Sequence, residues 1–289
     1  MTQPAALLSG PIGVFDSGHG GLTILRALVD RLPGRSFVYL GDHAHAPYGR
    51  RDADDIYRLT VEAIDWLFRQ GCPLVVVACN TAAAVALRRL QHDWLPVHHP
   101  HRRVLGVLVP MVEAITDVPW HVETPAPGLS PAPRTVGIFA TAATVASRAY
   151  PAEIGKRAPH IRVVQQACPD LVPLIEAGAA REAIRPVVHG YVAALKAQLG
   201  GAEPDSVVLG CTHYPLVADL FGEVLAPAVR IISQPVIAAD SLAGYLDRHP
   251  EFAAPAGPAP LRFHTSGDPA AVNASAERFV AADWIFRSA

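Results

Sequence analysis

Short, fully apolar segments alternate with helical patterns along most of this 289-residue chain. A strand that is apolar along its whole length must be covered on both faces, which is typical of parallel sheets flanked by helices. The alternation therefore predicts an α/β protein with parallel sheets. The predicted strands are 12–15, 37–40, 74–78, 104–109, 136–139, 161–165, 206–210 and 229–232, and the predicted helices are 22–32, 52–70, 80–92, 171–177 and two within 235–289. The proline-rich segments 117–133 and 255–260 are expected to be loops.

The two halves of the chain also resemble each other. Ile12–Phe15 is similar to Val136–Phe139, and the segment around Cys79 is similar to the one around Cys211, at offsets of 124 and 132 residues. Ligands of open α/β sheets bind at the carboxyl ends of the strands. We therefore expect two pseudo-symmetric parallel-sheet α/β domains with the active site in the cleft between them. The first domain would comprise 1–110 plus 236–289, and the second would comprise 111–235.

The composition argues against several functions. Lys and Arg number 24 against 26 Asp and Glu, a net charge of −2 that gives no electrostatic reason to bind nucleic acid or an anionic membrane. A pyridoxal phosphate enzyme needs a Schiff-base lysine, and only Lys156 and Lys196 are present, both in ordinary contexts. The first nine residues lack signal-peptide features, and no apolar run approaches the ~18 residues of a membrane span. We expect a cytoplasmic protein with reduced thiols.

Cys79 and Cys211 carry the strongest functional signal. Each directly follows an apolar strand and precedes residues that commonly begin helices, namely Asn80 and Thr81 in the first case and Thr212 in the second. A helix N-terminus favours the thiolate, so we expect both thiols to have a pKa below ~8.5. Buried cysteines are often inert, but the repeated pattern favours a function for this pair.

The other cysteines and the histidine clusters do not indicate a metal site. Cys72 and Cys168 adjoin prolines, are expected to be structural, and do not complete a zinc-binding spacing. His43 and His45 form one cluster and residues 98–101 hold another, but no third or fourth ligand can be assigned to either. We therefore predict no metal.

Two further sites each allow two interpretations, and a third allows one. Asp16 and Ser17 end the first strand before a glycine-rich turn. This turn could bind a small anion or be an ordinary tight turn. The spacing of its glycines does not fit a dinucleotide-binding fingerprint. His213 could assist Cys211 or have no role. Glu176 ends an apolar helix, and composition alone predicts a solvated helix end.

Several motifs together resemble the glutamate racemase family. They occur in the family's order over nearly the whole chain, and the two cysteine motifs in this order are highly specific. The resemblance implies a cofactor-independent racemase of the aspartate/glutamate racemase superfamily that acts on glutamate and forms a homodimer. The motifs are Asp16-Ser17-Gly18, Gly41-Asp42, Pro47-Tyr48-Gly49, Ala78-Cys79-Asn80-Thr81-Ala82, Ala140-Thr141, Thr144-Val145, Ala167-Cys168-Pro169, Leu171-Val172-Pro173, Glu176, Gly210-Cys211-Thr212-His213-Tyr214-Pro215 and Thr265-Ser266-Gly267-Asp268-Pro269.

The resemblance also implies roles for individual residues. Cys79, assisted by Asp16, would deprotonate the D-enantiomer. Cys211, assisted by His213, would deprotonate the L-enantiomer. Further acidic residues of the family's site are matched by Asp42 and Glu176, and substrate binding is implied for Ser17, Pro47, Tyr48, Gly49, Asn80, Thr81, Thr141, Thr144 and Thr212.

The chain departs from the family pattern at a few positions. His43-Ala44-His45 stands where Thr-Ala-Arg is usual, and Met111 and Ser233 also differ. The departures leave the two cysteine motifs intact and bear on the substrate. Two alternatives therefore stay open, a racemase for aspartate or another amino acid, and a non-catalytic amino-acid-binding regulator.

Overall fold

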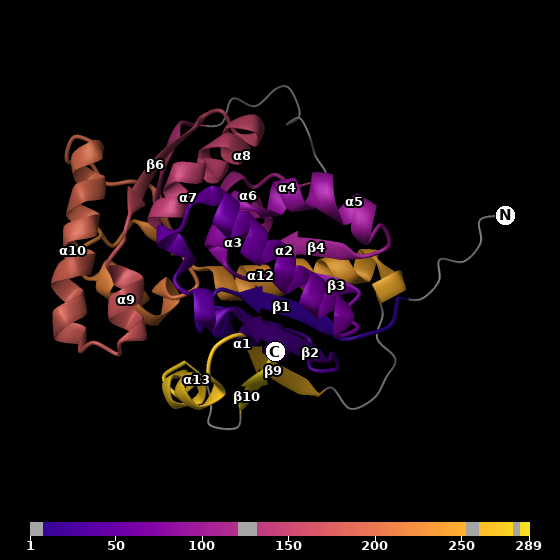
Figure 1. The fold of residues 1–289 in the computed structure, drawn as a ribbon. Coiled ribbons are helices and arrows are strands. Elements are labelled where there is room, and N and C mark those ends of the chain that lie inside the picture. Colours follow the sequence, from indigo (N-terminus) through magenta and orange to yellow (C-terminus); the bar gives the residue numbers. More distant parts are fainter. Residues whose placement is uncertain (1–7, 121–131, 253–259, 280–283) are drawn as a thin grey trace.

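The computed structural model describes residues 8–120, 132–252, 260–279 and 284–289. Two parallel sheets form the framework, one of six strands in the order β10-β9-β2-β1-β3-β4 and one of four in the order β6-β5-β7-β8 (Figure 1). All their strand pairs are parallel, which confirms the predicted fold class. The strands are β1 (Ile12–Asp16), β2 (Phe37–Gly41), β3 (Leu74–Val77), β4 (Arg103–Gly106), β5 (Arg134–Ala140), β6 (Ile161–Ala167), β7 (Ser206–Gly210), β8 (Arg230–Ile232), β9 (Leu261–Thr265) and β10 (Phe286–Ser288).

The two sheets share one local topology. The order β2-β1-β3-β4 in the larger sheet corresponds to β6-β5-β7-β8 in the smaller one, so β1 and β5 occupy equivalent central places. The chain leaves each central strand for a neighbour on one side and returns to the other side, which opens a crevice at the carboxyl ends. Strand register places Phe15 beside Val77 and Ala140 beside Gly210. The residues that follow these pairs, which include both cysteines, therefore lie at the two carboxyl edges.

Helices cover the sheets and join the two halves. Helix α12 follows the smaller sheet in sequence but packs along α1 of the larger half and against α6, which in turn contacts α8. Figure 1 shows the orange α12 lying among the violet elements of the larger half. The helices are α1 (Leu22–Arg31), α2 (Ala53–Arg69), α3 (Asn80–Val85), α4 (Leu87–Arg89), α5 (Leu95–His98), α6 (Leu108–Thr116), α7 (Ala142–Ser147), α8 (Ala149–Arg157), α9 (Leu171–Glu176), α10 (Arg181–Gln198), α11 (Ala218–Gly222), α12 (Gln234–Arg248) and α13 (Pro269–Ala276).

Several predicted boundaries are wrong for identifiable reasons. The strand predicted at 104–109 ends at Gly106, because Leu108 already begins α6. The helix predicted at 80–92 is interrupted and continues as α4, a π turn at 90–94 and α5. The tail holds two strands that were not predicted, because β9 alternates apolar and polar residues and β10 is a three-residue edge strand. Helix α10 was not predicted either, since it contains Pro186 and Gly190.

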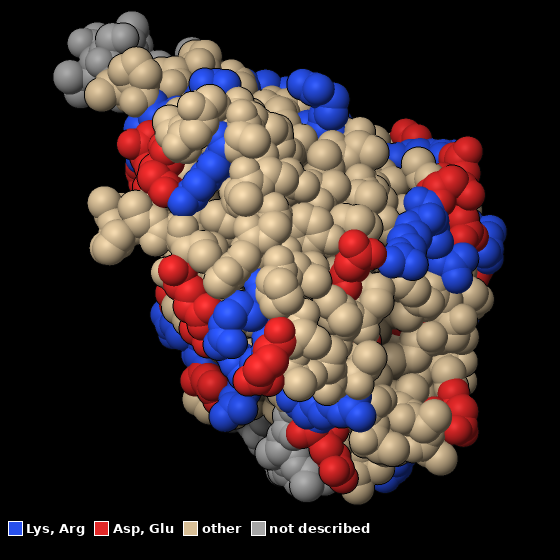
Figure 2. Space-filling model, turned by 90° about the vertical axis from the view of Figure 1, so that its left-hand side faces the viewer, with Lys and Arg blue, Asp and Glu red and all other residues tan. Residues whose placement is uncertain are grey.

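The distribution of surface charge and the hydropathy of the helices agree with what the composition predicts. On the face shown in Figure 2, acidic and basic side chains are interspersed around a broad uncharged area. Within the described ranges, no helix is both long and apolar enough to cross a bilayer. Most of the predicted loops at 117–133 and 255–260 lie outside the described residues.

Candidate active site

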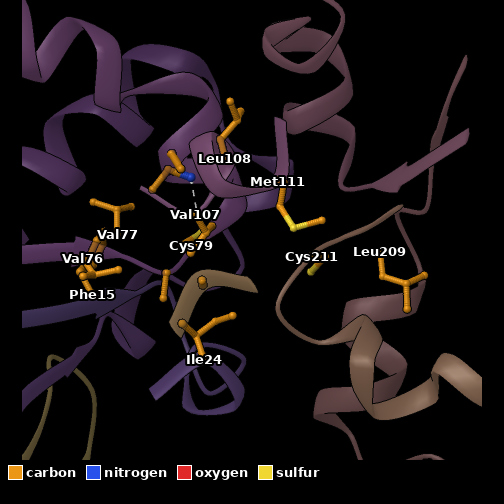
Figure 3. Close-up of a cluster of buried hydrophobic side chains, with 14 of the residues drawn as sticks. Phe15, Ile24, Val76, Val77, Cys79, Val107, Leu108, Met111, Leu209 and Cys211 are labelled. Carbon is orange, nitrogen blue, oxygen red and sulfur yellow. Dashed lines mark hydrogen bonds between the residues drawn. The ribbon is translucent and has the colours of Figure 1, made fainter. Parts of the chain in front are cut away.

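A cavity of about 40 Å³ lies where the carboxyl ends of both sheets meet. Cys79, directly after β3, and Cys211, directly after β7, both line it, and each residue is 5% exposed. Figure 3 shows the two cysteines on different parts of the fold. The full lining comprises Ser17, Pro47, Tyr48, Gly49, Arg50, Cys79, Asn80, Thr81, Thr141, Ala142, Cys168, Pro169, Val172, Pro173, Cys211, Thr212 and His213. A second cavity of about 480 Å³ adjoins it and shares Ser17, Pro47, Arg50, Val172, Pro173 and His213.

The Cys79 thiol is held by two groups. Cys79 is itself the N-cap of α3, and its sulfur accepts from the Ala82 amide at 3.5 Å, whereas sequence reasoning gave the capping role to Asn80 and Thr81. The Ser17 hydroxyl lies 3.4 Å from the same sulfur. Burial, reinforced by the charge of Asp16, raises the pKa of the Cys79 thiol to about 12 despite the hydrogen bonds from Ser17 and Ala82. The expected lowering of this pKa is therefore wrong, because desolvation outweighs the helix N-terminus.

Asp16 lies at the end of β1, behind the cavity wall. Its carboxylate accepts from the Gly18 amide at 2.9 Å and lies 3.5 Å from the hydroxyl of Thr212, on the opposite half of the fold. Burial raises the pKa of Asp16 to about 6, although the charge of His213 and backbone hydrogen bonds act in the other direction. A carboxyl group with this pKa can exchange a proton near neutral pH.

Cys211 has a different environment from Cys79. It lies in a turn before a 3-10 helix at Tyr214–Val217, so the predicted helix N-terminus at this cysteine is wrong, and Thr212 caps nothing. The Cys211 sulfur instead faces His213 Nδ1 at 3.8 Å. His213 Nε2 lies 2.5 Å from Glu176 Oε1. Burial alone would lower the pKa of His213, but its hydrogen bonds to Cys211 and Glu176 outweigh burial and raise the pKa to about 10.

Glu176 is more buried than the composition of its helix predicted. Both carboxylate oxygens are occupied, Oε1 by His213 and Oε2 by His19 Nδ1 at 3.0 Å. Burial opposes ionisation of this carboxyl, but the hydrogen bonds from His19 and His213 hold its pKa well below the usual range. Glu176 is therefore an ionised partner of two histidines rather than a solvated helix end.

The residues expected to bind substrate fall into two groups. Ser17, Pro47, Tyr48, Gly49, Asn80, Thr81, Thr141 and Thr212 line the cavity. Thr144 does not, but its hydroxyl lies 3.0 Å from that of Thr141, which in turn lies 2.9 Å from the Thr81 hydroxyl.

Asp42, expected to be an acidic site residue, lies behind the cavity lining. Its carboxylate accepts from the Tyr48 hydroxyl at 2.5 Å and from the Ser266 hydroxyl, and it lies 2.9 Å from His45 Nδ1. Asp42 thus fixes Tyr48, a wall of the cavity.

Sequence reasoning missed several residues at this site. Gln234 and Asn80 pair through their amides at 2.5 and 2.7 Å, and Tyr150 joins them at 3.2 Å from Asn80. Cys168, expected to be purely structural, lines the cavity. His19 lies directly after the Asp16-Ser17-Gly18 motif, and a titratable side chain inside a glycine-rich turn was the signal that could have revealed it.

The two histidines of the His43 cluster have separate partners. His43 Nδ1 lies 2.9 Å from the Thr265 hydroxyl, whereas His45 contacts Asp42. Within the described part of the chain, no group of three or more His, Cys, Asp or Glu side chains is arranged to hold a metal ion.

Comparisons with known proteins agree on one family. The profile of the Asp/Glu/Hydantoin racemase family matches residues 12–242. A glutamate racemase from Phenylobacterium zucineum is 50% identical over 273 residues, which cover 93% of this chain and 96% of that protein. A crystal structure of a glutamate racemase from Bacillus anthracis has a TM-score of 0.82 at 28% identity, covering 97% of both chains. One from Francisella tularensis, in complex with D-glutamate, has a TM-score of 0.80 at 27% identity, covering 98% of this chain and 97% of that chain.

Proposed function

This chain belongs to the Asp/Glu/Hydantoin racemase family, and we propose that it interconverts L-glutamate and D-glutamate without a cofactor, using Cys79 and Cys211 as its two acid/base groups. The observation that carries this proposal is that both thiols line one cavity, with the charge of Asp16 acting on Cys79 and the imidazole of His213 facing Cys211. The substrate is inferred from the relatives, which are glutamate racemases at 45–50% identity.

The reaction itself requires two opposed groups. Removing the α-proton leaves a planar, carbanion-like centre, and inversion requires the new proton to arrive on the opposite face. One side chain cannot easily serve both faces, whereas two thiols from opposite halves of a pseudo-symmetric fold can. We assign deprotonation of the L-enantiomer to Cys211 and deprotonation of the D-enantiomer to Cys79.

The Cys211 side is arranged to act as a base. Because its pKa is about 10, His213 is an imidazolium at neutral pH, and its Nδ1–H faces the Cys211 sulfur. A cation in this place stabilises the thiolate form of the neighbouring cysteine. The thiolate takes the α-proton of L-glutamate, and Glu176 keeps the imidazolium in place through Nε2.

The Cys79 side is arranged to act as an acid. With a pKa near 12, Cys79 is a protonated thiol at neutral pH, ready to deliver its proton to the α-carbon and complete D-glutamate. In the reverse direction Cys79 must first lose that proton. Asp16, with its pKa near 6, is the group we assign to accept it.

The remaining cavity residues suit an acidic amino acid. Hydroxyls of Ser17, Thr81 and Thr141, together with backbone N–H groups at the strand ends, supply donors for carboxylates and for the charge that develops in the transition state. The lining residues include no lysine, which a Schiff-base mechanism would require.

An enantiomer assay over a panel of amino acids tests this function. Purified protein without added cofactor should racemise glutamate, and aspartate or neutral amino acids should react far more slowly. Preferred turnover of aspartate would establish the racemase alternative left open by His43, His45, Met111 and Ser233. Tight glutamate binding without turnover would establish the binding-protein alternative.

The cellular role follows from the product. We propose that the D-glutamate supplied by this reaction is used for peptidoglycan, in the cytoplasm. A homodimer stays a prediction from the family resemblance, and sedimentation equilibrium of the purified chain tests it.

A further inference from the structure

His19 extends the contacts that begin at Cys211. The Cys211 sulfur faces His213, His213 contacts Oε1 of Glu176, and Oε2 of Glu176 lies 3.0 Å from Nδ1 of His19. The Glu176 carboxylate is ionised, so it accepts from both imidazoles. His19 thus binds Oε2 of Glu176, while Oε1 of the same carboxylate contacts His213 beside Cys211.

The imidazole of His19 is itself fixed on its other sides. Its Nε2 lies 3.2 Å from the Val272 carbonyl and 3.1 Å from the Ser275 hydroxyl, both on α13. The ring stacks on Phe279, with centroids 5.1 Å apart and planes 10° from parallel, and packs edge-on against His43 at 4.3 Å. His19 is also buried, and these contacts keep its Nδ1 directed at Glu176.

The loop that carries His19 serves both halves of the site. Ser17, on the same loop, lies 3.4 Å from the Cys79 sulfur, and Asp16, the last residue of β1, acts on Cys79 through its charge. Glu176 and His213 follow strands of the other sheet. The hydrogen bond between His19 and Glu176 therefore links the loop of the Cys79 half to the acid/base pair of the Cys211 half.

Without His19, Glu176 would lose the bond that sets its orientation. Its side chain is 29% exposed, so water could hydrate Oε2 and the carboxylate could rotate away from His213. A small displacement of a group that orients a catalytic base costs about 10-fold or more in rate.

We propose that His19 is a positioning residue for the Cys211 half of the reaction, acting through Glu176 on His213. This inference rests on the proposed racemase function and assigns a role to one residue within it. Loss of His19 should raise the barrier for proton transfer at Cys211 and leave proton transfer at Cys79 unchanged.

Primary deuterium isotope effects on kcat/KM separate the two faces. His19→Phe keeps an aromatic ring against Phe279 and removes the Nδ1–H donor. It should lower kcat from L-glutamate about 10-fold or more. Raising the barrier at Cys211 makes that step more rate-limiting, so the isotope effect with α-deuterated L-glutamate should increase and the effect with α-deuterated D-glutamate should decrease. A general structural disturbance has no reason to move the two effects in opposite directions.

Three further variants complete the test. His19→Asn places an amide N–H near the position of Nδ1 and should restore isotope effects toward wild-type values. His19→Leu repeats the loss of the donor with a smaller side chain, in case the Phe ring distorts the fold. His249→Phe removes a histidine that pairs with Glu251 away from both cavities and should behave as wild type.

The outcomes distinguish this inference from the proposed function. An active wild-type enzyme whose isotope effects are unchanged in His19→Phe and His19→Leu, or move in the same direction for both substrates, would overturn the role of His19 alone. A wild-type enzyme inactive on both enantiomers would overturn the proposed function and this inference with it.

Discussion

Gly20 lies directly against the imidazole of His213. A Cβ atom built on Gly20 would come within 2.4 Å of His213 Nδ1 and within 2.3 Å of the Thr212 hydroxyl oxygen. Both distances are shorter than real Cβ contacts, so only glycine permits this approach. The loop after β1 can therefore reach the loop after β7 because position 20 has no side chain.

Adding one methyl group at this position should damage catalysis. Gly20→Ala would push His213 away from Cys211, and we expect kcat to fall by about 100-fold because an imidazolium displaced by ~1 Å is no longer aligned with the Cys211 sulfur. Steady-state kinetics measures kcat, and circular dichroism checks that the variant keeps its fold. Gly34→Ala is the matched control, since nothing lies within 4 Å of its Cβ. A Gly20→Ala enzyme with wild-type kcat would contradict the assigned position of His213.

Removal of either cavity thiol should abolish racemisation. Cys79→Ala and Cys211→Ala each delete one of the two acid/base groups, and kcat should fall by about 10³-fold or more in both directions. Chiral chromatography of the products measures the loss. Cys72→Ala serves as control, because Cys72 is buried outside both cavities. Near-normal turnover in either cavity variant would refute the two-thiol mechanism.

His213→Asn should affect the two directions unequally. The variant weakens the base for L-glutamate, so kcat from L-glutamate should fall more than kcat from D-glutamate. The two values of kcat/KM must fall together, because the equilibrium between enantiomers is fixed. The comparison therefore uses separate kcat values, and identical losses of kcat would remove the assignment of Cys211 to the L-face.

Asp16→Asn should stabilise the fold while it impairs activity. Folding raises the pKa of Asp16 from 3.8 to about 6, so the ionised carboxylate destabilises the native state by up to about 3 kcal/mol above pH 6. This cost disappears as the pH falls from 6 to below 4, because both states then bind the proton. Urea unfolding should therefore show a more stable variant at pH 8 and a smaller difference at pH 4.5. Equal stability of variant and wild type at pH 8 would contradict the raised pKa.

The placement of the two cysteines could be predicted from the sequence, because it depends only on which residues directly follow each strand. Cys79 and Cys211 each follow an apolar strand, and parallel strands end at a common edge, so their placement in one cleft could be inferred without coordinates. Hydrophobic patterns were sufficient where strands are buried on both faces. They failed at β9, whose alternating residues belong to a partly exposed strand.

The electrostatics of the site could not be inferred in the same way. The expectation for Cys79 rested on a nearby helix N-terminus, whereas its pKa is set mainly by burial, which depends on the whole tertiary structure. Glu176 and His19 are 157 residues apart, and no local pattern predicts their contact. Short-range sequence signals thus identify the reacting groups, and long-range packing sets their proton affinities.

The origin of the α-hydrogen in the product tests the two-thiol account most directly. Each glutamate enantiomer is incubated with the enzyme in deuterated water without added cofactor, and both enantiomers are separated at early times and examined by mass spectrometry. If the two cysteines act on opposite faces, newly formed product carries one solvent deuterium while recovered substrate keeps its original hydrogen. Product that retains the substrate's own hydrogen would show that a single group serves both faces and would contradict the account.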